Sequence, residues 1–202
     1  MNAEHGRVVD DLAFLRALAE GGGESQRATG LALCIGGALY GMQSLAFGAL
    51  AYGWVTMSEP VQGAISTGVT VAFLIAIGWI TWRNRAPQTG GIVARALNAV
   101  FASAGTATLS LLVGFATVAL REKSLTIWLL YPCAVFALQG AAWTAAWMLR
   151  RRAWLGVVAL GWLVSAAVLA VSIGTAHYPM IAGVALLLFM AVPGRVMMRS
   201  AH

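Results

Sequence analysis

The sequence predicts an all-α polytopic membrane protein, a bundle of six transmembrane helices preceded by a short N-terminal amphipathic helix. Six long apolar stretches fill almost all of the chain after residue 28, and none carries Asp, Glu, Lys or Arg deep in its interior. A stretch of about 18 or more apolar residues can cross the hydrocarbon core as a helix. Of the 202 residues, 60% are hydrophobic and only 10% are charged, whereas a soluble domain carries about one quarter charged residues.

Residues 1–28 are predicted to form a cytoplasmic N-terminal segment that contains the amphipathic helix, over residues 8–20. The apolar residues of this helix share one face, at Val8, Leu12, Leu15 and Ala19. The acidic pair at 10–11 suits a first turn, and the glycines at 21–23 predict a helix end. Because basic helices are the ones that bind membrane surfaces, this acidic helix is expected either to rest on the bundle or to dock on a partner protein.

The remaining residues, 29–199, are predicted to form one six-helix transmembrane domain. Its spans are expected at residues 29–54, 61–82, 96–119, 125–149, 153–174 and 178–197. The loops between them are short, so consecutive helices are predicted to lie antiparallel and side by side in an up-down bundle. Trp residues gather near the ends of these spans, where amphipathic rings prefer the headgroup region.

Basic residues are distributed unevenly between the two sides of the predicted bundle. Eleven of the thirteen lie before the first span, after the second and fourth spans, or at the end of the sixth, and only Arg121 and Lys123 lie on the other side. Cytoplasmic loops carry an excess of Arg and Lys, so both termini are predicted to be cytoplasmic. This asymmetry accounts for the net charge of +6 without nucleic acid as a partner, and the Arg-, Ala- and Gly-rich composition favours a bacterial inner membrane.

The first span carries small residues on one face, at Gly30, Gly37, Gly41, Ser44 and Gly48. Small side chains allow two helix backbones to approach closely in a membrane. Gly37, Gly41, Ser44 and Gly48 are therefore predicted to be helix-packing residues, in contact with another span or with a second copy in a homo-oligomer. A glycine-lined ligand surface is the alternative.

The third span carries a stripe of hydroxyl side chains on one face, at Ser103, Thr106, Ser110 and Thr117. Such hydroxyls can bond to the carbonyl four residues earlier in their own helix. They therefore need no ligand, and the stripe is expected to be a buried contact between helices. The wall of a polar cavity is the alternative.

Two side-chain amides are predicted near the middle of the membrane. Gln43 and Gln139 each lie about 14 residues into a span, which reaches the midplane at about 1.5 Å per residue. An amide without a partner in hydrocarbon costs several kcal/mol. Each is expected either to bond to another helix or to belong to a midplane ligand site, where Gln139 would share a face with Phe136 and Trp143, and Gln43 with Tyr40.

Two prolines are predicted to bend their spans. Pro132 lies in the fourth span and Pro193 in the sixth. Each lacks an N–H and leaves a backbone carbonyl one turn earlier without its usual donor.

No metal site, cofactor or catalytic machinery is predicted. Cys34 and Cys133 lie in different spans without metal-ligand spacing, and the three histidines are scattered along the chain. The sequence contains no hydrolase, metalloprotease or phosphate-loop motif. Because membrane catalysis generally needs acids, bases or a metal, enzyme activity is not expected.

The segment from Leu129 to Arg199 reads LLYPCAVFALQG, then RRR, then VPGRVMMR. Together with the acidic head DDLAFLRALAE, it resembles small multi-spanning inner-membrane proteins of alphaproteobacteria. The resemblance is one of general pattern, spread over the chain. It implies a polytopic inner-membrane protein and transfers no mechanism, cofactor or site residue.

These patterns favour a non-catalytic membrane protein that binds a lipid, a small apolar ligand or a partner protein, in an accessory, sensing or transport role. Its expected partners are membrane lipids, a protein along residues 8–20, and a second copy of the chain. The alternative is an uncoupled transporter or channel with a midplane pocket lined by Gln43, Gln139, Phe136, Trp143 and Tyr40. A lipid-modifying enzyme is the third interpretation.

The charge asymmetry predicts the topology, which reporter fusions can measure. Alkaline phosphatase folds to its active form only outside the cytoplasm, so fusions at either terminus are expected to be inactive and a fusion after Glu122 active. A green fluorescent protein at the same three positions should give the reverse pattern. Opposite results at the two termini would contradict an even number of crossings.

Overall fold

The structure is a computed structural model that describes the backbone of residues 2–83 and 92–199, and side chains from residue 26 onward except at 92 and 94. Every regular element in these ranges is a helix, and no strand is present within them. The helices are α1 (Asn2–Ala51), α2 (Glu59–Arg83), α3 (Ile92–Arg121), α4 (Leu125–Arg150), α5 (Ala153–Val171), α6 (His177–Leu186), the π-helix η1 (Leu187–Ala191) and α7 (Val192–Arg199). The last three follow one another without a break, so the described residues contain six candidate membrane spans.

The predicted bundle of six spans is confirmed, and every predicted boundary lies within about three residues of the observed one. The first span ends at Ala51 rather than at 54 because Gly53 adopts a left-handed conformation with φ of 73°. The N–H of Trp54 donates to Ala49 O and that of Gly53 to Leu50 O, a pair of bonds that closes helix ends at glycine.

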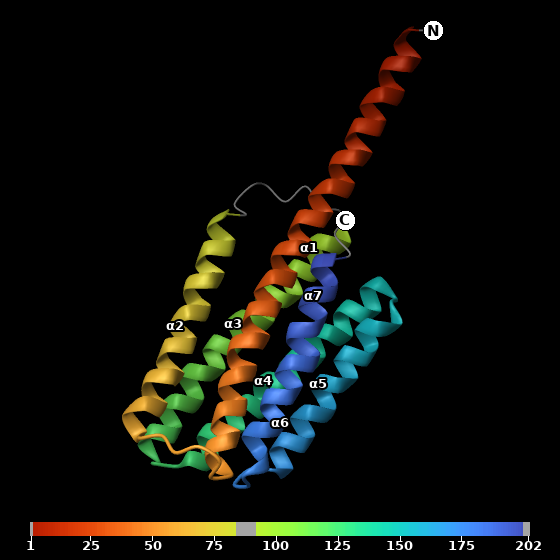
Figure 1. Ribbon diagram of the computed structural model, residues 1–202. Coiled ribbons are helices and arrows are strands. Elements are labelled where there is room, and N and C mark those ends of the chain that lie inside the picture. The colour runs from red at the N-terminus through yellow and green to blue at the C-terminus, as the bar shows by residue number, and fades with distance from the viewer. Residues whose placement is uncertain (1, 84–91, 200–202) are drawn as a thin grey trace.

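The predicted helix end at residues 21–23 is wrong, because α1 continues through the three glycines as one helix of 50 residues. Glycine lowers helix stability by about 1 kcal/mol relative to alanine, but it keeps the N–H that the backbone ladder requires. The amphipathic segment is therefore collinear with the first span. It extends beyond the bundle by about 24 residues, or about 36 Å (Figure 1).

Helix α1 is the central helix of the bundle (Figure 1). It packs against α2 on one side and against α6, η1 and α7 on another, while α4 lies between α3 and α5. Consecutive spans pack together as predicted, except that α2 and α3 make no substantial contact in the described part of the chain. The link at 84–91 lies outside the described residues. Eight residues can reach up to about 28 Å, so its length does not force these helices together.

The glycine face of α1 lies against the last span of the same chain. A Cβ atom at Gly41 would lie 2.9 Å from the Leu187 side chain, and one at Gly48 would lie 2.7 Å from Met180 Cγ. One at Gly37 would collide with the backbone of Ala191. Closer to the chain ends, a Cβ atom at Gly194 would lie 2.6 Å from Gly30 O. The two helices therefore approach at distances that only glycine allows, and Ser44 is partly buried on the same helix.

The π-helix η1 has a cause in the sequence. Pro193 provides no N–H for the carbonyl of Phe189, one turn earlier. The indole N–H of Trp162 in α5 donates to this carbonyl at 2.9 Å. The ring of Phe189 packs on Gly161, the residue before Trp162. The Phe189 carbonyl that Pro193 leaves without a backbone donor thus receives a hydrogen bond from the neighbouring helix α5.

Pro132 lies inside α4, where the carbonyl that it deprives of a donor is that of Trp128. In the turn before Pro132, the carbonyl of Leu129 accepts a hydrogen bond from the Tyr178 hydroxyl at 2.6 Å. Tyr178 belongs to the first turn of α6 and is buried. A polar side chain of the last span therefore bonds to the backbone close to the proline.

The hydroxyl stripe of α3 is not a buried contact, which corrects the prediction. Its four members are exposed, and each hydroxyl donates to the carbonyl four residues earlier: Ser103 to Ala99, Thr106 to Ala102, Ser110 to Thr106 and Thr117 to Val113. Because these bonds lie within one helix, the hydroxyls require no second helix to cover them.

Replacing Gly41 with leucine is expected to destabilise the bundle, because the new side chain would overlap Leu187. Overpacking of this kind costs about 1–3 kcal/mol, which thermal unfolding in detergent measures. Gly68→Leu is the matched control, since nothing lies within 4 Å of a Cβ atom at Gly68 in α2. Equal melting temperatures for Gly41→Leu and Gly68→Leu would contradict the observed packing.

Candidate functional site

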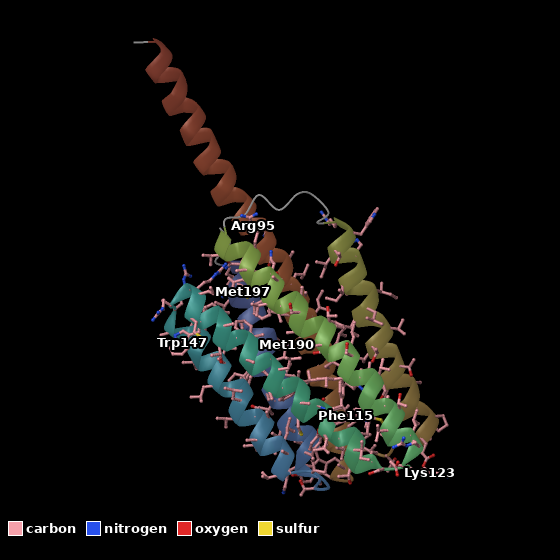
Figure 2. All side chains as sticks on the ribbon, turned by 180° about the vertical axis from the view of Figure 1, so that it is seen from behind. Arg95, Phe115, Lys123, Trp147, Met190 and Met197 are labelled. Atoms are coloured by element: carbon pink, nitrogen blue, oxygen red, sulfur yellow. The ribbon has the colours of Figure 1, made fainter. Side chains whose placement is uncertain are left out.

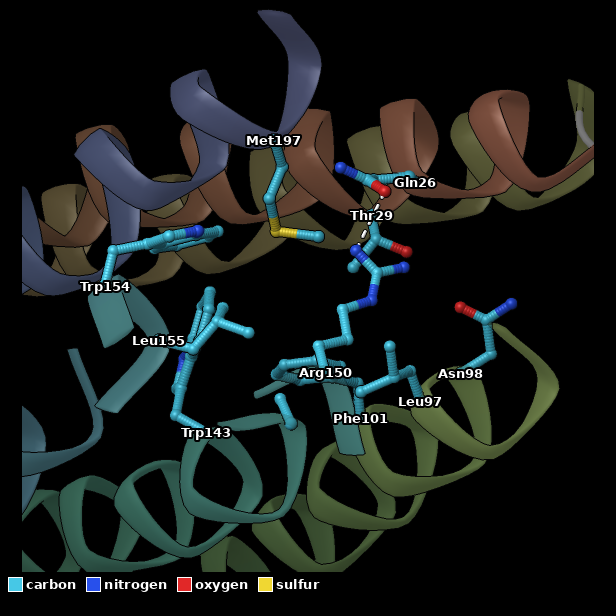
Figure 3. A pocket seen from close by; sticks show the side chains of 11 residues that line it. Gln26, Thr29, Leu97, Asn98, Phe101, Trp143, Arg150, Trp154, Leu155 and Met197 are labelled. Carbon is cyan, nitrogen blue, oxygen red and sulfur yellow. Dashed lines mark hydrogen bonds between the residues drawn. The ribbon is translucent and has the colours of Figure 1, made fainter. Parts of the chain in front are cut away.

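A small cavity lies at the end of the bundle where α7 ends, between α1, α3, α4, α5 and α7 (Figure 3). Its volume is about 30 Å³, enough for about two water molecules. Figure 3 shows its polar side chains on one side and the indoles of Trp143 and Trp154 on the other. The polar lining residues are Gln26, Thr29, Asn98 and Arg150.

Arg150 is the charged residue of this cavity. It is the last residue of α4, because Arg151 takes a left-handed conformation with φ of 52° and donates its N–H to Trp147 O. The Arg150 side chain turns back toward α1, where Nη1 donates to Gln26 Oε1 at 2.9 Å (Figure 3). The guanidinium is partly buried, so its charge is less well solvated than that of Arg151 and Arg152, which are exposed.

No carboxylate among the described side chains neutralises Arg150. The two described carboxylates are Glu59, which begins α2, and Glu122, which pairs with Arg121 at 3.0 Å. Both lie at the opposite end of the bundle, where α2 begins and α3 ends (Figure 1). A neutral amide does not neutralise the positive charge of a partly buried guanidinium, so an anion beside Arg150 would be stabilised.

Trp143 adds a second unsatisfied group to the lining. It is only 1% exposed and packs edge to face against Phe101, with ring centroids 5.3 Å apart, and against Trp154 at 6.1 Å. Its indole Nε1 is buried without a hydrogen-bond partner among the described residues. A buried donor without an acceptor costs about 1–3 kcal/mol, so the cavity contains two groups that both favour a ligand with acceptor oxygens.

The predicted pair Tyr40 and Gln43 lies at the contact between α1 and α2. The Tyr40 ring packs edge to face on Phe73 at 5.3 Å, and Gln43 Nε2 donates to Ser66 Oγ at 3.3 Å. The other amide atom, Gln43 Oε1, is buried without a partner in the described structure. Turning the amide over would leave Nε2 without a partner instead. The hydrogen bond that was expected between Gln43 and another helix is therefore present at Nε2 and absent at Oε1 among the described residues.

The predicted residues of α4 face a different part of the bundle. Phe136 is buried against Trp162 of α5, edge to face, with ring centroids 4.7 Å apart. Gln139 is partly buried and forms no hydrogen bond with a described residue. Tyr40 and Gln43 therefore contact side chains of α2, whereas Phe136 and Trp143 contact aromatic rings of α5 and α3.

Sequence analysis missed Arg150 as a site residue. Its charge lies in the run Arg150–Arg152, which the topology rule alone explains. Arg150 is the last residue of α4 and is partly buried, whereas Arg151 and Arg152 follow the helix and are exposed. Helical spacing contains the missed signal, because Arg150 follows Trp143 by seven residues and shares its face.

The described residues contain no group of three or more His, Cys, Asp or Glu side chains that could hold a metal ion. Cys34 and Cys133 are both free thiols. On the opposite end of the bundle, the Tyr52 hydroxyl pairs with His177 Nδ1, and the Tyr52 ring stacks on Trp54. These groups are exposed and tie the end of α1 to the start of α6.

No protein-family model, no curated protein and no solved structure matches the chain.

Proposed function

We propose that the chain is a non-catalytic, multi-pass protein of a bacterial inner membrane that binds a partner protein through its N-terminal helix, in an accessory or sensing role. The observation that supports this proposal is the form of α1. Its N-terminal part extends from the bundle, and no other described helix lies beside it (Figure 1). An amphipathic helix that presents an apolar stripe is a common recognition element for a groove on another protein.

The charge of the projecting segment favours a protein partner over the lipid surface. Residues 1–24 contain five carboxylates and two arginines, whereas the rest of the chain is strongly basic. An acidic helix is repelled by the anionic lipids of a cytoplasmic leaflet. The complementary partner is a protein with a groove that is apolar at its centre and basic at its rim.

Because α1 is one continuous helix, a partner bound to its projecting part is connected directly to the membrane domain. The same helix that projects from the bundle also packs against α2, α6, η1 and α7. A partner that tilts the projecting part therefore acts on a helix at the centre of the bundle. This arrangement suits a sensing role as well as a passive anchoring role.

The charge distribution supports a cytoplasmic position for both termini. Arg95 and Met197 lie at one end of the bundle and Lys123 at the other (Figure 2). The end near Arg95 also contains Arg83 and the run 150–152. The excess of basic residues at this end is typical of a cytoplasmic face.

A second candidate function is uncoupled transport or ligand binding at mid-membrane depth. The observation that favours it is Gln43 Oε1, a buried acceptor without a partner in the described structure. A small molecule with a hydroxyl or amide N–H would satisfy this atom between α1 and α2. This candidate differs from the first in requiring solute flux across liposomes that contain only this protein.

Gentle purification from native membranes tests the first proposal. The full chain is expected to retain a stoichiometric partner in native mass spectrometry, and Leu15→Asp is expected to release it by placing a charge in the apolar stripe. Ala17→Asp is the matched control, because residue 17 lies on the opposite face of the predicted helix.

Two outcomes would contradict this proposal. One is a partner that remains bound to Leu15→Asp as firmly as to Ala17→Asp. The other is a full-length chain that emerges from native membranes without any protein partner.

A further inference from the structure

The lining of the cavity beside Arg150 contains a guanidinium with one hydrogen bond to a described residue and a buried indole N–H without a partner among those residues. Arg150 has five N–H groups, and its one hydrogen bond to a described residue is the bond from Nη1 to Gln26. Trp143 is 1% exposed, and its N–H has no partner in the described part of the chain. Both groups can donate a hydrogen bond to a ligand oxygen, and the positive guanidinium favours an oxygen that carries negative charge.

The cavity lies at the depth where lipid phosphates are found. Arg150 is the last residue of its candidate membrane span. Trp147, one turn earlier on α4, is 43% exposed at the bundle surface, and indoles at such a position mark the headgroup region. The adjacent Arg151 and Arg152 are exposed, so their field favours an approaching anion.

We propose that this cavity is a binding site for a phosphate group, with Arg150 as the residue that binds its oxygens. Guanidinium groups bind phosphate through charge-assisted, often bidentate, hydrogen bonds. Gln26, Thr29 and Asn98 line the same side of the cavity and form its polar wall (Figure 3). A water molecule beside Trp143 would accept a hydrogen bond from its N–H, and the cavity volume of about 30 Å³ is sufficient for one.

The phosphate can come from a lipid headgroup or from free phosphate in solution. The position of Arg150 at the membrane boundary favours the lipid, because the apolar surface of the bundle would accept its acyl chains. The site is independent of the proposed partner protein, since it involves the membrane end of α1 and not residues 8–20. Basic pockets between transmembrane helices bind anionic headgroups in this way.

Native mass spectrometry in a non-ionic detergent tests the site with the full chain and defined probes. The probes are dioleoyl phosphatidylglycerol, dioleoylglycerol, which lacks the phosphate, and inorganic phosphate. Phosphatidylglycerol is expected to bind about tenfold or more tightly than dioleoylglycerol, as loss of a charge-assisted contact implies. Displacement of the lipid by millimolar inorganic phosphate would identify free phosphate as the source, and its failure to displace would identify the lipid.

Matched variants separate this site from general lipid adhesion. Arg150→Gln is expected to weaken phosphatidylglycerol binding about tenfold or more, whereas Arg152→Gln, which removes an exposed charge at the same end, is expected to change it by less than about twofold. Arg150→Lys keeps the charge without the planar fork and should fall between them. Thermal unfolding of each variant without added lipid checks that it is folded.

Equal effects of Arg150→Gln and Arg152→Gln would overturn the proposal, because they would indicate surface charge alone. Equal binding of phosphatidylglycerol and dioleoylglycerol would overturn it as well. If Arg150→Gln proves unfolded, the comparison of the three probes on Arg150→Lys and on the unsubstituted chain still decides the question.

Discussion

The close approach of α1 to the last span is the constraint on which the packing of these two spans depends. Lipid tails are as apolar as the side chains that they surround, so helices in a membrane gain little from hiding apolar surface from one another. Contact between backbones supplies van der Waals attraction instead, and glycine permits the closest contact. Gly37, Gly41 and Gly48 of α1 meet Ala191, Leu187 and Met180 without room for a Cβ atom. This contact joins the first and last spans, while α4 packs between α3 and α5.

The same contact positions the polar groups of the bundle. With α7 against α1, Met197 and Gln26 lie together at the cavity that Arg150 enters from α4. Elsewhere in the bundle, Trp162 donates to the Phe189 carbonyl that Pro193 frees, and Tyr178, in the first turn of α6, donates to the carbonyl of Leu129. Hydrocarbon offers no water to satisfy such carbonyls. The carbonyl freed by Pro193 is therefore satisfied within the described protein, whereas the buried N–H of Trp143 has no partner among the described residues.

Hydropathy alone predicted the six spans, because crossing the bilayer requires a length and composition that leave little freedom. Local spacing also identified the glycine face of α1 and the prolines. It failed where the outcome depends on three-dimensional neighbours. The glycines at 21–23 do not end α1, α2 and α3 do not pack together, and the hydroxyls of α3 are exposed. Arg150 escaped notice because one rule about topology explained all three arginines at the α4–α5 turn, although its spacing of seven residues from Trp143 places it on the same helix face.

Disulfide cross-linking in native membranes tests the contact between α1 and the last span directly. A Cβ atom at Gly183 would lie 2.7 Å from Leu45 Cγ, so cysteines at these two positions would bring their side chains together. In a chain with Cys34→Ala and Cys133→Ala, the pair Leu45→Cys and Gly183→Cys is expected to form this bond on mild oxidation. The bond would hold together the two fragments produced by a protease site in the α3–α4 turn. The fragments of a control with Leu45→Cys and Val164→Cys should separate, and separation in both chains would contradict the packing on which the account depends.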